Sequence, residues 1–284
     1  MDRVTMSNLA RRALKGEKLT LVAAHDYPTA QALDAAGIDI ILVSDALGLT
    51  ALGGESVFPV SLDDIIYHTR AVARAAKRAL VAATLPLGTY ETPEAAAANS
   101  LRLVKEAGAK AIELEGNREI LDQVRAASRA GVPVLSHIGM TKQIVLRRGT
   151  FSVVGKKAAS AAEILETARA HEEAGAAALL LECVPDRVAA LVTGQAGIPV
   201  LGIGAGPHCH GQGLVAADML GLFAEFTPKF ARQYADLGKA MAEAFTAFRQ
   251  EVASGAFPGK EHTFTIPDEE FSLIEGKEKP ARGK

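Results

Sequence analysis

Residues 106–116, EAGAKAIELEG, contain the end of a predicted helix, a turn and an apolar segment that follows it. A glycine placed directly after a helix commonly takes the left-handed backbone conformation that ends the helix. The same order of helix end, glycine, short turn and apolar run recurs at residues 35–40, 129–134, 173–178 and 195–200. Five such joints, tens of residues apart, predict a chain in which helices alternate with strands.

The apolar runs between the helices are continuous, which is typical of parallel strands covered on both faces. Ser61 with Asp64 predicts a capping box, and Thr92 before Pro93 predicts another helix start. Eight strands with helical crossovers predict a (β/α)₈ barrel of the TIM type, with a doubly wound open sheet as the alternative. The expected strands are 19–25, 38–44, 79–84, 110–115, 133–137, 178–183, 199–203 and 218–223.

The chain length of 284 residues fits one barrel, which usually needs about 250 residues. We assign residues 1–264 to this catalytic domain and expect a long amphipathic helix from about residue 229 onward. The segment 265–284 is charged and contains Pro and Gly, so it is predicted to be a disordered tail.

Composition excludes several classes of function. The net charge of −2 is spread along the chain, so nucleic acid is not an expected partner. No apolar run reaches the roughly 20 residues that span a bilayer, and the charged N-terminus has no apolar core for a secretory signal. Cys183 and Cys209 form neither a disulfide framework nor a paired metal motif. These features predict a cytoplasmic protein.

Barrel enzymes place their chemistry at the carboxyl ends of the strands. Glu113 and Glu115 are two residues apart, so they share one strand face and need a cation or a proton between them. A carboxylate such as Glu182 on a buried strand is costly without a partner. Taken together, the charged residues at the strand ends favour a metal-assisted acid–base site. The structural alternatives are that an Asp at a strand end caps the next helix and that His137 is a hydrogen-bonded imidazole of the core. The candidates are His25, Asp26, Asp45, Thr84, Glu113, Glu115, His137, Glu182 and the GIGAG segment 202–206.

Several blocks in this order resemble the ketopantoate hydroxymethyltransferase family, of the phosphoenolpyruvate mutase/isocitrate lyase superfamily of barrels. The similarity runs from about residue 5 to 264. It is carried by AHDYPTAQALDAAGIDIILVSDALG, FPVSLDDIIYHTRAV, LEG, VLSHIGMTKQ, LLLECVP, PVLGIGAG, TPKFARQY and SGAFPGKEHTF.

The resemblance implies transfer of a hydroxymethyl group from 5,10-methylenetetrahydrofolate to 3-methyl-2-oxobutanoate, which makes ketopantoate for pantothenate biosynthesis. It implies a magnesium ion held at Asp45 and Glu115, a substrate contact at His137 and a general base at Glu182. The metal would act as a Lewis acid that stabilises the enolate of the 2-oxo acid. The resemblance also implies a homo-oligomer, a decamer of two pentameric rings in the bacterial enzymes.

Five positions depart from the family pattern. Thr84 stands in place of a third metal-binding Asp, and Ala46 replaces a substrate-binding Ser in the sequence DALG. Glu113 replaces a Lys that contacts the substrate carboxylate, which makes the site more acidic and should repel an anionic substrate. His25 replaces a Tyr, and His210 replaces an Asp in PHCHGQ, residues 207–212, which is otherwise interpreted as a surface loop.

These departures leave alternatives open. Glu113 could supply the carboxylate missing at Thr84, or His25 and His210 could favour Mn²⁺, Fe²⁺ or Zn²⁺ over Mg²⁺. The first functional hypothesis is the family reaction. The second is a paralogue that acts on another 2-oxo acid or performs a C–C lyase or aldol-type step, and the third is a non-catalytic family member.

Overall fold

The structure is a computed structural model that describes residues 3–222 and 228–275. The chain divides into two compact units, Met1–Ala235 and Asp236–Lys284. None of the helices in the described ranges is long and apolar enough to cross a membrane.

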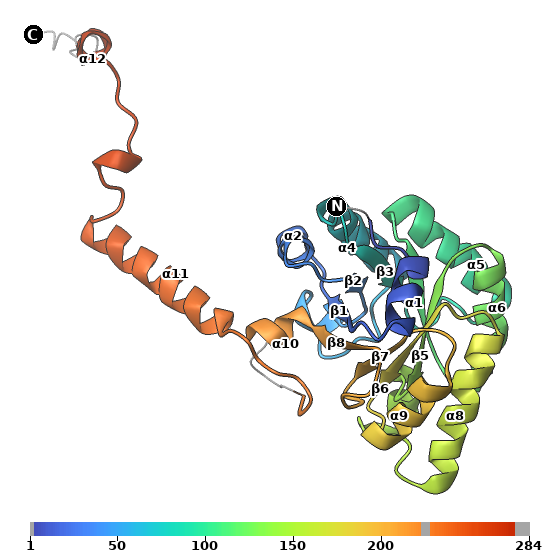
Figure 1. The fold of residues 1–284 in the computed structure, drawn as a ribbon. Helices are drawn as coiled ribbons and strands as arrows, with labels where there is room; N and C mark the ends of the chain where they lie inside the picture. The colour runs from blue at the N-terminus through green and yellow to red at the C-terminus, as the bar shows by residue number, and fades with distance from the viewer. Residues whose placement is uncertain (1–2, 223–227, 276–284) are drawn as a thin grey trace, which may run out of the picture. The chain divides into compact units, whose positions relative to one another are not determined.

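The first unit is a closed barrel of parallel strands in sequence order, in which β1 pairs with both β2 and β8 (Figure 1). The predicted (β/α)₈ fold is therefore confirmed, and the open sheet is excluded. The strands are β1 Leu19–Ala23, β2 Ile40–Val43, β3 Leu80–Thr84, β4 Ala111–Glu115, β5 Val134–Gly139, β6 Ala178–Glu182, β7 Val200–Ile203 and β8 Gly211–Val215.

Helices surround the strands of this unit (Figure 1). The α-helices are α1 Met6–Leu14, α2 Tyr27–Ala35, α3 Leu47–Thr50, α4 Leu62–Ala75, α5 Pro93–Arg102, α6 Leu121–Arg129, α7 Lys142–Arg148, α8 Ala158–Glu173, α9 Asp186–Gln195 and α10 Ala216–Leu220. A π-helical turn, η1 Leu103–Ala107, extends α5, and a 3-10 turn, η2 Arg118–Ile120, precedes α6.

The predicted eighth strand at 218–223 is wrong. Residues 211–215, GQGLV, form β8, while residues 218–220 of the expected run lie in α10 and residue 223 falls outside the described ranges. The connection from β7 to β8 has no helix, and β8 contains two glycines instead of a continuous apolar run. A Cβ on Gly211 would lie 2.5 Å from the Leu19 carbonyl oxygen, so close packing of neighbouring strands requires glycine there.

The barrel interior is filled by alternate residues of the strands, and α1 covers its amino end. Leu21, Leu42 and Leu180 belong to this interior cluster, and Leu9 of α1 packs against it. The intervening residues, such as Ile112 of β4, pack outward in the layer between strands and helices. This alternation determines which polar residues can face the barrel axis.

Four of the five predicted helix–glycine–strand joints have the glycine in a left-handed conformation, as at Gly108 with φ 86°. Gly197 is the exception. Its N–H donates to the Glu172 carboxylate of α8, and a Cβ there would lie 2.7 Å from that side chain. The predicted capping box of Ser61 and Asp64 is present, and the side chain of Thr92 caps α5.

An ionic network ties α1 to the amino end of the barrel. The buried Asp39 carboxylate accepts from Arg12 Nη1 at 2.6 Å and from Arg78 Nη2 at 3.1 Å. It also accepts from the backbone N–H and the hydroxyl of Thr20. This network lies at the face opposite the carboxyl ends of the strands, so its role is structural.

The second unit contains α11 Leu237–Ser254, a 3-10 turn η3 Lys260–His262 and α12 Asp268–Glu275. The helix expected from residue 229 therefore begins eight residues later, after a segment in which the Tyr234 N–H bonds to the Met219 carbonyl of α10. The predicted disordered tail, 265–284, includes α12, and its last part, 276–284, lies outside the described residues.

Candidate active site

Strand parity places most of the predicted site residues inside the barrel at its carboxyl end. Ala111 of β4 faces the interior cluster while Ile112 and Leu114 face outward, so Glu113 and Glu115 both point inward as predicted. The same parity directs Thr84, His137 and Glu182 inward from β3, β5 and β6. Glu113 lies beside Thr84 in the strand register, and Glu115 lies beside His137 one layer nearer the carboxyl end.

Four of these residues form a continuous polar chain across the barrel. The Thr84 hydroxyl donates to Glu113 Oε2, and Glu113 Oε1 lies 3.0 Å from His137 Nδ1. On the other side of the imidazole, Nε2 lies 2.9 Å from Glu182 Oε2. The imidazole of His137 is thus held between two carboxylates, one deep in the barrel and one near its mouth.

The contacts within this polar chain determine the protonation states of His137 and Glu113. Burial would lower the pKa of His137, but the surrounding carboxylates Glu115, Glu113 and Glu182 raise it well above the usual range. Burial would raise the pKa of Glu113, but the hydrogen bond and charge of His137 outweigh burial and lower it. His137 is therefore an imidazolium and Glu113 is a carboxylate at neutral pH.

A lysine lies between the two carboxylates that were predicted to bind metal. The Lys142 ammonium contacts Asp45 Oδ2, and it lies 2.6 Å from Glu115 Oε2. The backbone N–H of Lys142 donates to the other oxygen of Glu115, Oε1. Both oxygens of Glu115 are thus occupied by one residue that belongs to the first turn of α7.

Neighbouring contacts hold Glu115 and Lys142 in place. The Tyr90 hydroxyl and Gln143 Nε2 each donate to the Glu115 backbone carbonyl at 2.8 Å. Gln143 also bonds the Tyr90 hydroxyl, and the Thr141 side chain caps α7. The start of α7 is therefore fastened to the end of β4 through Lys142 and Gln143.

The charges of this second cluster follow from burial and pairing. Burial would lower the pKa of Lys142, but Asp45 and then Glu115 raise it well above the usual range. Burial raises the pKa of Asp45 to about 6, although the Lys142 charge opposes the rise. With every carboxylate ionised, four acidic side chains face Lys142 and the His137 imidazolium, and two negative charges remain uncompensated.

The backbone after Glu182 is strained. Cys183 has a left-handed φ of 50°, which costs a non-glycine residue about 1–2 kcal/mol. Its N–H donates to the Ile203 carbonyl and its carbonyl accepts from Val154, so two segments hold it in this conformation. Burial, and then the charge of Glu182, raises the pKa of the Cys183 thiol to about 11, so Cys183 is not a thiolate nucleophile.

Three predicted residues at strand ends have other partners. His25 Nδ1 lies 3.4 Å from the Thr50 hydroxyl, and burial, with the nearby His68, lowers the pKa of His25 to about 4. Asp26 caps α2, which is the structural alternative foreseen for such residues. Ala46 precedes α3 and its carbonyl accepts from Thr50, while its methyl group offers no polar contact to a substrate.

His210 does not lie with the other predicted site residues. It directly precedes β8, its carbonyl accepts from the Leu19 N–H and its Nδ1 accepts from the Val200 N–H. Both partners are first residues of strands, so His210 lies at the amino end of the barrel. The proposal that it supplies a metal ligand is not supported, because the eighth strand begins at Gly211 instead of residue 218.

The residues present do not form a divalent-metal site in this arrangement. Across residues 3–222 and 228–275, no group of three or more His, Cys, Asp and Glu side chains is arranged to hold a metal ion. Both oxygens of Glu113 already have partners, Oε2 the Thr84 hydroxyl and Oε1 the His137 imidazole, so the structure gives no support to Glu113 as the replacement metal ligand. The Lys142 ammonium lies where Asp45 and Glu115 would share the ion.

Lys142 is the residue that sequence reasoning missed. A lysine in the first turn of a helix opposes the positive end of the helix dipole, so it needs a carboxylate partner. It also follows shortly after the end of β5, where site residues collect in a barrel. These two signals together could have identified it from the stretch MTKQ.

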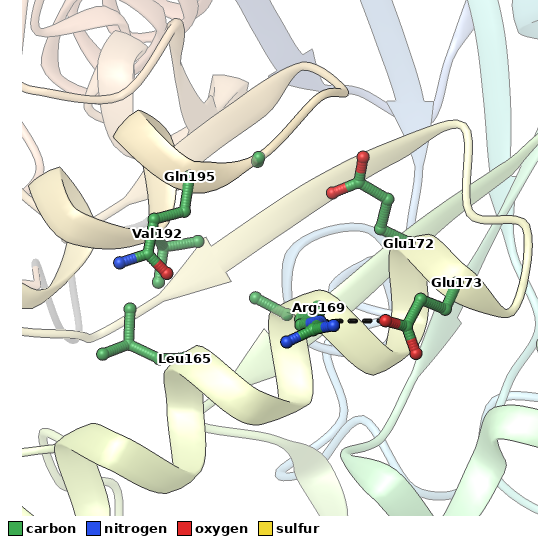
Figure 2. A pocket seen from close by; sticks show the side chains of 8 residues that line it. Leu165, Arg169, Glu172, Glu173, Val192 and Gln195 are labelled. Atoms are coloured by element: carbon green, nitrogen blue, oxygen red, sulfur yellow. Dashed lines mark hydrogen bonds and ion pairs between the residues drawn. The ribbon is translucent and has the colours of Figure 1, made fainter.

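A surface groove lies apart from this site. It runs between α8 and α9 and includes Leu165, Val192 and Gln195, with Arg169 paired to Glu173 at 2.9 Å (Figure 2). These side chains belong to the outer helical layer, and none of the predicted site residues lines the groove.

The fold and the site define a barrel protein whose buried charged side chains gather at the carboxyl ends of its strands. The family model for ketopantoate hydroxymethyltransferase matches residues 3–260. The chain belongs to the ketopantoate hydroxymethyltransferase family, as its motifs predicted.

Curated relatives agree over nearly the full length. A 3-methyl-2-oxobutanoate hydroxymethyltransferase of Enterococcus faecalis is 47% identical, covering 90% of this chain and 94% of the relative. The protein of the same name from Moorella thermoacetica is 47% identical, with coverage of 93% and 98%.

Solved structures support the fold. A 2,3-dimethylmalate lyase, described as a PEP mutase/isocitrate lyase superfamily member, superposes with a TM-score of 0.59 at 18% identity and covers 96% of this chain and 95% of its own. A phosphonopyruvate hydrolase in complex with oxalate and magnesium gives a TM-score of 0.57 at 18% identity, with coverage of 97% and 99%.

Proposed function

We propose that this protein transfers a hydroxymethyl group from 5,10-methylenetetrahydrofolate to 3-methyl-2-oxobutanoate and produces ketopantoate. Family membership over residues 3–260 supports the reaction and implies the folate co-substrate. The observation that carries the assignment of roles is the placement of Glu182 at the barrel mouth, 2.9 Å from the His137 imidazole.

Glu182 is the general base of this proposal. Its side chain is 21% exposed, against 4% for Glu113, so it is the more accessible of these two carboxylates. Its Oε2 contacts His137, while Oε1 makes none of the polar contacts found among the described residues. The contact with His137 orients the Glu182 carboxylate.

The reaction begins with removal of the C3 proton of 3-methyl-2-oxobutanoate by Glu182. The C–H electron pair forms the C2–C3 double bond, and negative charge moves to the 2-oxo oxygen. The enolate carbon then forms a bond to the one-carbon unit as that unit leaves the folate nitrogens. Water supplies the hydroxyl oxygen, and tetrahydrofolate is released. A positioned base of this kind typically accelerates such a proton transfer about 10²–10⁴-fold.

The test measures ketopantoate formation by NMR with both substrates present. A second assay follows exchange of the C3 proton in D₂O without folate. Glu182→Gln should lower the exchange rate about 10²–10⁴-fold. Glu163→Gln, on an exposed face of α8, serves as the matched control and should leave both rates unchanged.

Exchange in Glu182→Gln at the wild-type rate would remove Glu182 as the base. Wild-type exchange without ketopantoate formation would favour the second hypothesis, a paralogue that acts on another 2-oxo acid or performs a C–C lyase or aldol-type step. The changes at Ala46, Thr84 and Glu113 favour this alternative most specifically, because all three fall on the substrate or metal side of the site. No exchange with any 2-oxo acid would favour a non-catalytic family member.

We also propose that the protein is a homo-oligomer located in the cytoplasm. Met241, Phe245, Phe248 and Val252 recur at helical spacing along α11, and each is at least 47% exposed. An apolar stripe of this kind commonly packs against another copy or element. Light scattering coupled to gel filtration would give the mass of the assembly, and a monomer of 29.7 kDa would contradict the proposal.

A further inference from the structure

We propose that the Lys142 ammonium replaces the divalent cation in this chain, so that the enolate is stabilised by a cation covalently part of the protein. The inference rests on the proposed function and concerns which cation stabilises the enolate in that same site. Its basis is geometric: the ammonium lies between Asp45 and Glu115, the two carboxylates that the family resemblance assigns to metal.

Lys142 already contacts oxygen atoms of both carboxylates that a metal would use, Asp45 and Glu115. Glu115 Oε2 lies 2.6 Å from Lys142 Nζ, and Oε1 accepts from the Lys142 backbone N–H. The Lys142 side chain is only 10% exposed and comes from the helix that follows β5. A divalent ion bound to the same oxygens would lie against a buried ammonium, and like charges at such distances repel strongly in a site screened from water.

Three consecutive residues fix the ammonium in this position. The Thr141 side chain caps α7, the Lys142 N–H bonds Glu115, and Gln143 bonds both the Glu115 carbonyl and the Tyr90 hydroxyl. A lysine at the start of a helix is disfavoured by the helix dipole. The carboxylates therefore outweigh the dipole, and moving the ammonium away would leave the buried Asp45 without this cation and Glu115 with only the Lys142 N–H and the more distant His137.

The substitutions elsewhere in the site are consistent with this replacement. Thr84 removes one carboxylate from the metal side, and its hydroxyl instead donates to Glu113. Glu113 removes the family's substrate-binding cation from β4. Lys142 of α7 supplies one positive charge at the carboxyl end of the barrel. This charge lies beside Asp45 and Glu115, whereas position 113 lies beside Thr84.

The chemistry needs no further reactant. An ammonium has three N–H donors, of which Asp45 and Glu115 take two, and the third is available to the 2-oxo oxygen. As Glu182 takes the C3 proton, the C–H electron pair becomes the C2–C3 double bond and the 2-oxo oxygen becomes anionic. That oxygen then accepts a charge-assisted hydrogen bond from Lys142, an electrostatic stabilisation that a Lewis acid otherwise supplies.

A covalent role for Lys142 is a different mechanism. Schiff-base formation needs a neutral amine, which enzymes obtain by desolvation or by a neighbouring cation. The Lys142 nitrogen lies between the Asp45 and Glu115 carboxylates, an arrangement that suits a hydrogen-bonding ammonium and not a free amine. Borohydride treatment with 3-methyl-2-oxobutanoate should therefore leave the mass of the protein unchanged.

The test compares wild type with Lys142→Met and with Lys105→Met, an exposed lysine on η1, after exhaustive chelation. The first readout is Mn²⁺ binding by electron paramagnetic resonance without substrate. Wild type and Lys105→Met should bind weakly, and Lys142→Met should bind at least about tenfold more tightly because the competing charge is gone. The second readout is C3 proton exchange, which should persist in chelated wild type and fall about a hundredfold or more in Lys142→Met.

Three results would overturn the inference. The first is tight Mn²⁺ binding by wild type, and the second is loss of C3 proton exchange in chelated wild type with recovery when Mn²⁺ is added. The third is covalent trapping of the substrate on Lys142 by borohydride. If Lys142→Met does not fold, Lys142→Gln and the wild-type Mn²⁺ titration give the same decision. Absence of exchange and product in every sample would defeat the proposed function alone, since Mn²⁺ binding without substrate still decides whether Lys142 excludes the metal.

Discussion

The pairing of Glu113 with His137 gives the sharpest prediction about this barrel. Both side chains are almost fully buried, with exposed fractions of 4% and 7%, and Oε1 lies 3.0 Å from Nδ1. Glu113→Gln keeps the shape of the side chain and an oxygen that can accept from His137, while its amide N–H can donate to the Thr84 hydroxyl, which reverses that hydrogen bond. The substitution therefore removes the negative charge and little else.

The magnitude follows from the distance. Two unit charges 3.0 Å apart attract by about 5 kcal/mol at an effective dielectric constant of about 20. Removing one partner of a buried pair typically costs about 3–5 kcal/mol. His137 keeps Glu182 at 2.9 Å and Glu115 at 3.7 Å, so we expect the lower end, a loss of about 3 kcal/mol in the free energy of unfolding.

The pH dependence of this loss has a definite sign. The pKa of His137 is raised in the folded protein, so the pair contributes fully below the usual histidine pKa and the contribution disappears as pH rises through the raised value. The pKa of Glu113 is lowered, so its contribution disappears as pH falls through that lowered value. The cost of Glu113→Gln is therefore largest in mildly acidic solution, between the usual pKa values of glutamate and histidine, and smaller in base or strong acid.

Urea unfolding of the variant and wild type at pH 6.5 measures the cost, with equal slopes required for a valid comparison. The exposed Glu163→Gln is the control and should change stability by no more than about 0.5 kcal/mol. NMR of the His137 imidazole should show a lower pKa in Glu113→Gln than in wild type. Equal stability and an unchanged imidazole titration would refute the assignment of a buried ion pair.

Three further changes test the frame around the site. Asp39→Asn should destabilise the barrel by about 2–3 kcal/mol, because Arg12 loses its anionic partner. This loss should vanish as pH falls through the lowered pKa of Asp39. Urea unfolding at pH 7 and pH 3 measures the loss, and an equal cost at both pH values would count against the pairing. Gly211→Ala should destabilise by more than about 1 kcal/mol through the clash with the Leu19 carbonyl, and an unchanged melting temperature would contradict the strand packing. Tyr90→Phe should lower the free energy of unfolding by about 1–2 kcal/mol and slow C3 proton exchange, because the Tyr90 hydroxyl donates to the backbone carbonyl of Glu115. A stable, fully active variant would show that this contact does not position the Glu115 carboxylate.

Much of the fold could be predicted because its signals are local. The helix–glycine–strand joints, the Ser61 capping box and the continuous apolar strands each depend on residues a few positions apart. The inward orientation of Glu113 and Glu115 followed from strand alternation alone. The eighth strand was missed because β8 is glycine-containing and its crossover lacks a helix, so both the local signals were absent.

The sequence by itself determined the barrel, the family and the carboxylates at the strand ends. Only the tertiary structure decided how those charges pair. Lys142 is 97 residues from Asp45 in the chain, and it meets Asp45 because the barrel brings the ends of β2, β4 and β5 together. The tertiary structure also separated His210 from the other predicted site residues, because the position of His210 depends on where β8 begins. Local rules fix which face a side chain occupies, but the charge balance of a buried site depends on contacts between distant segments, and those exist only once the barrel has closed.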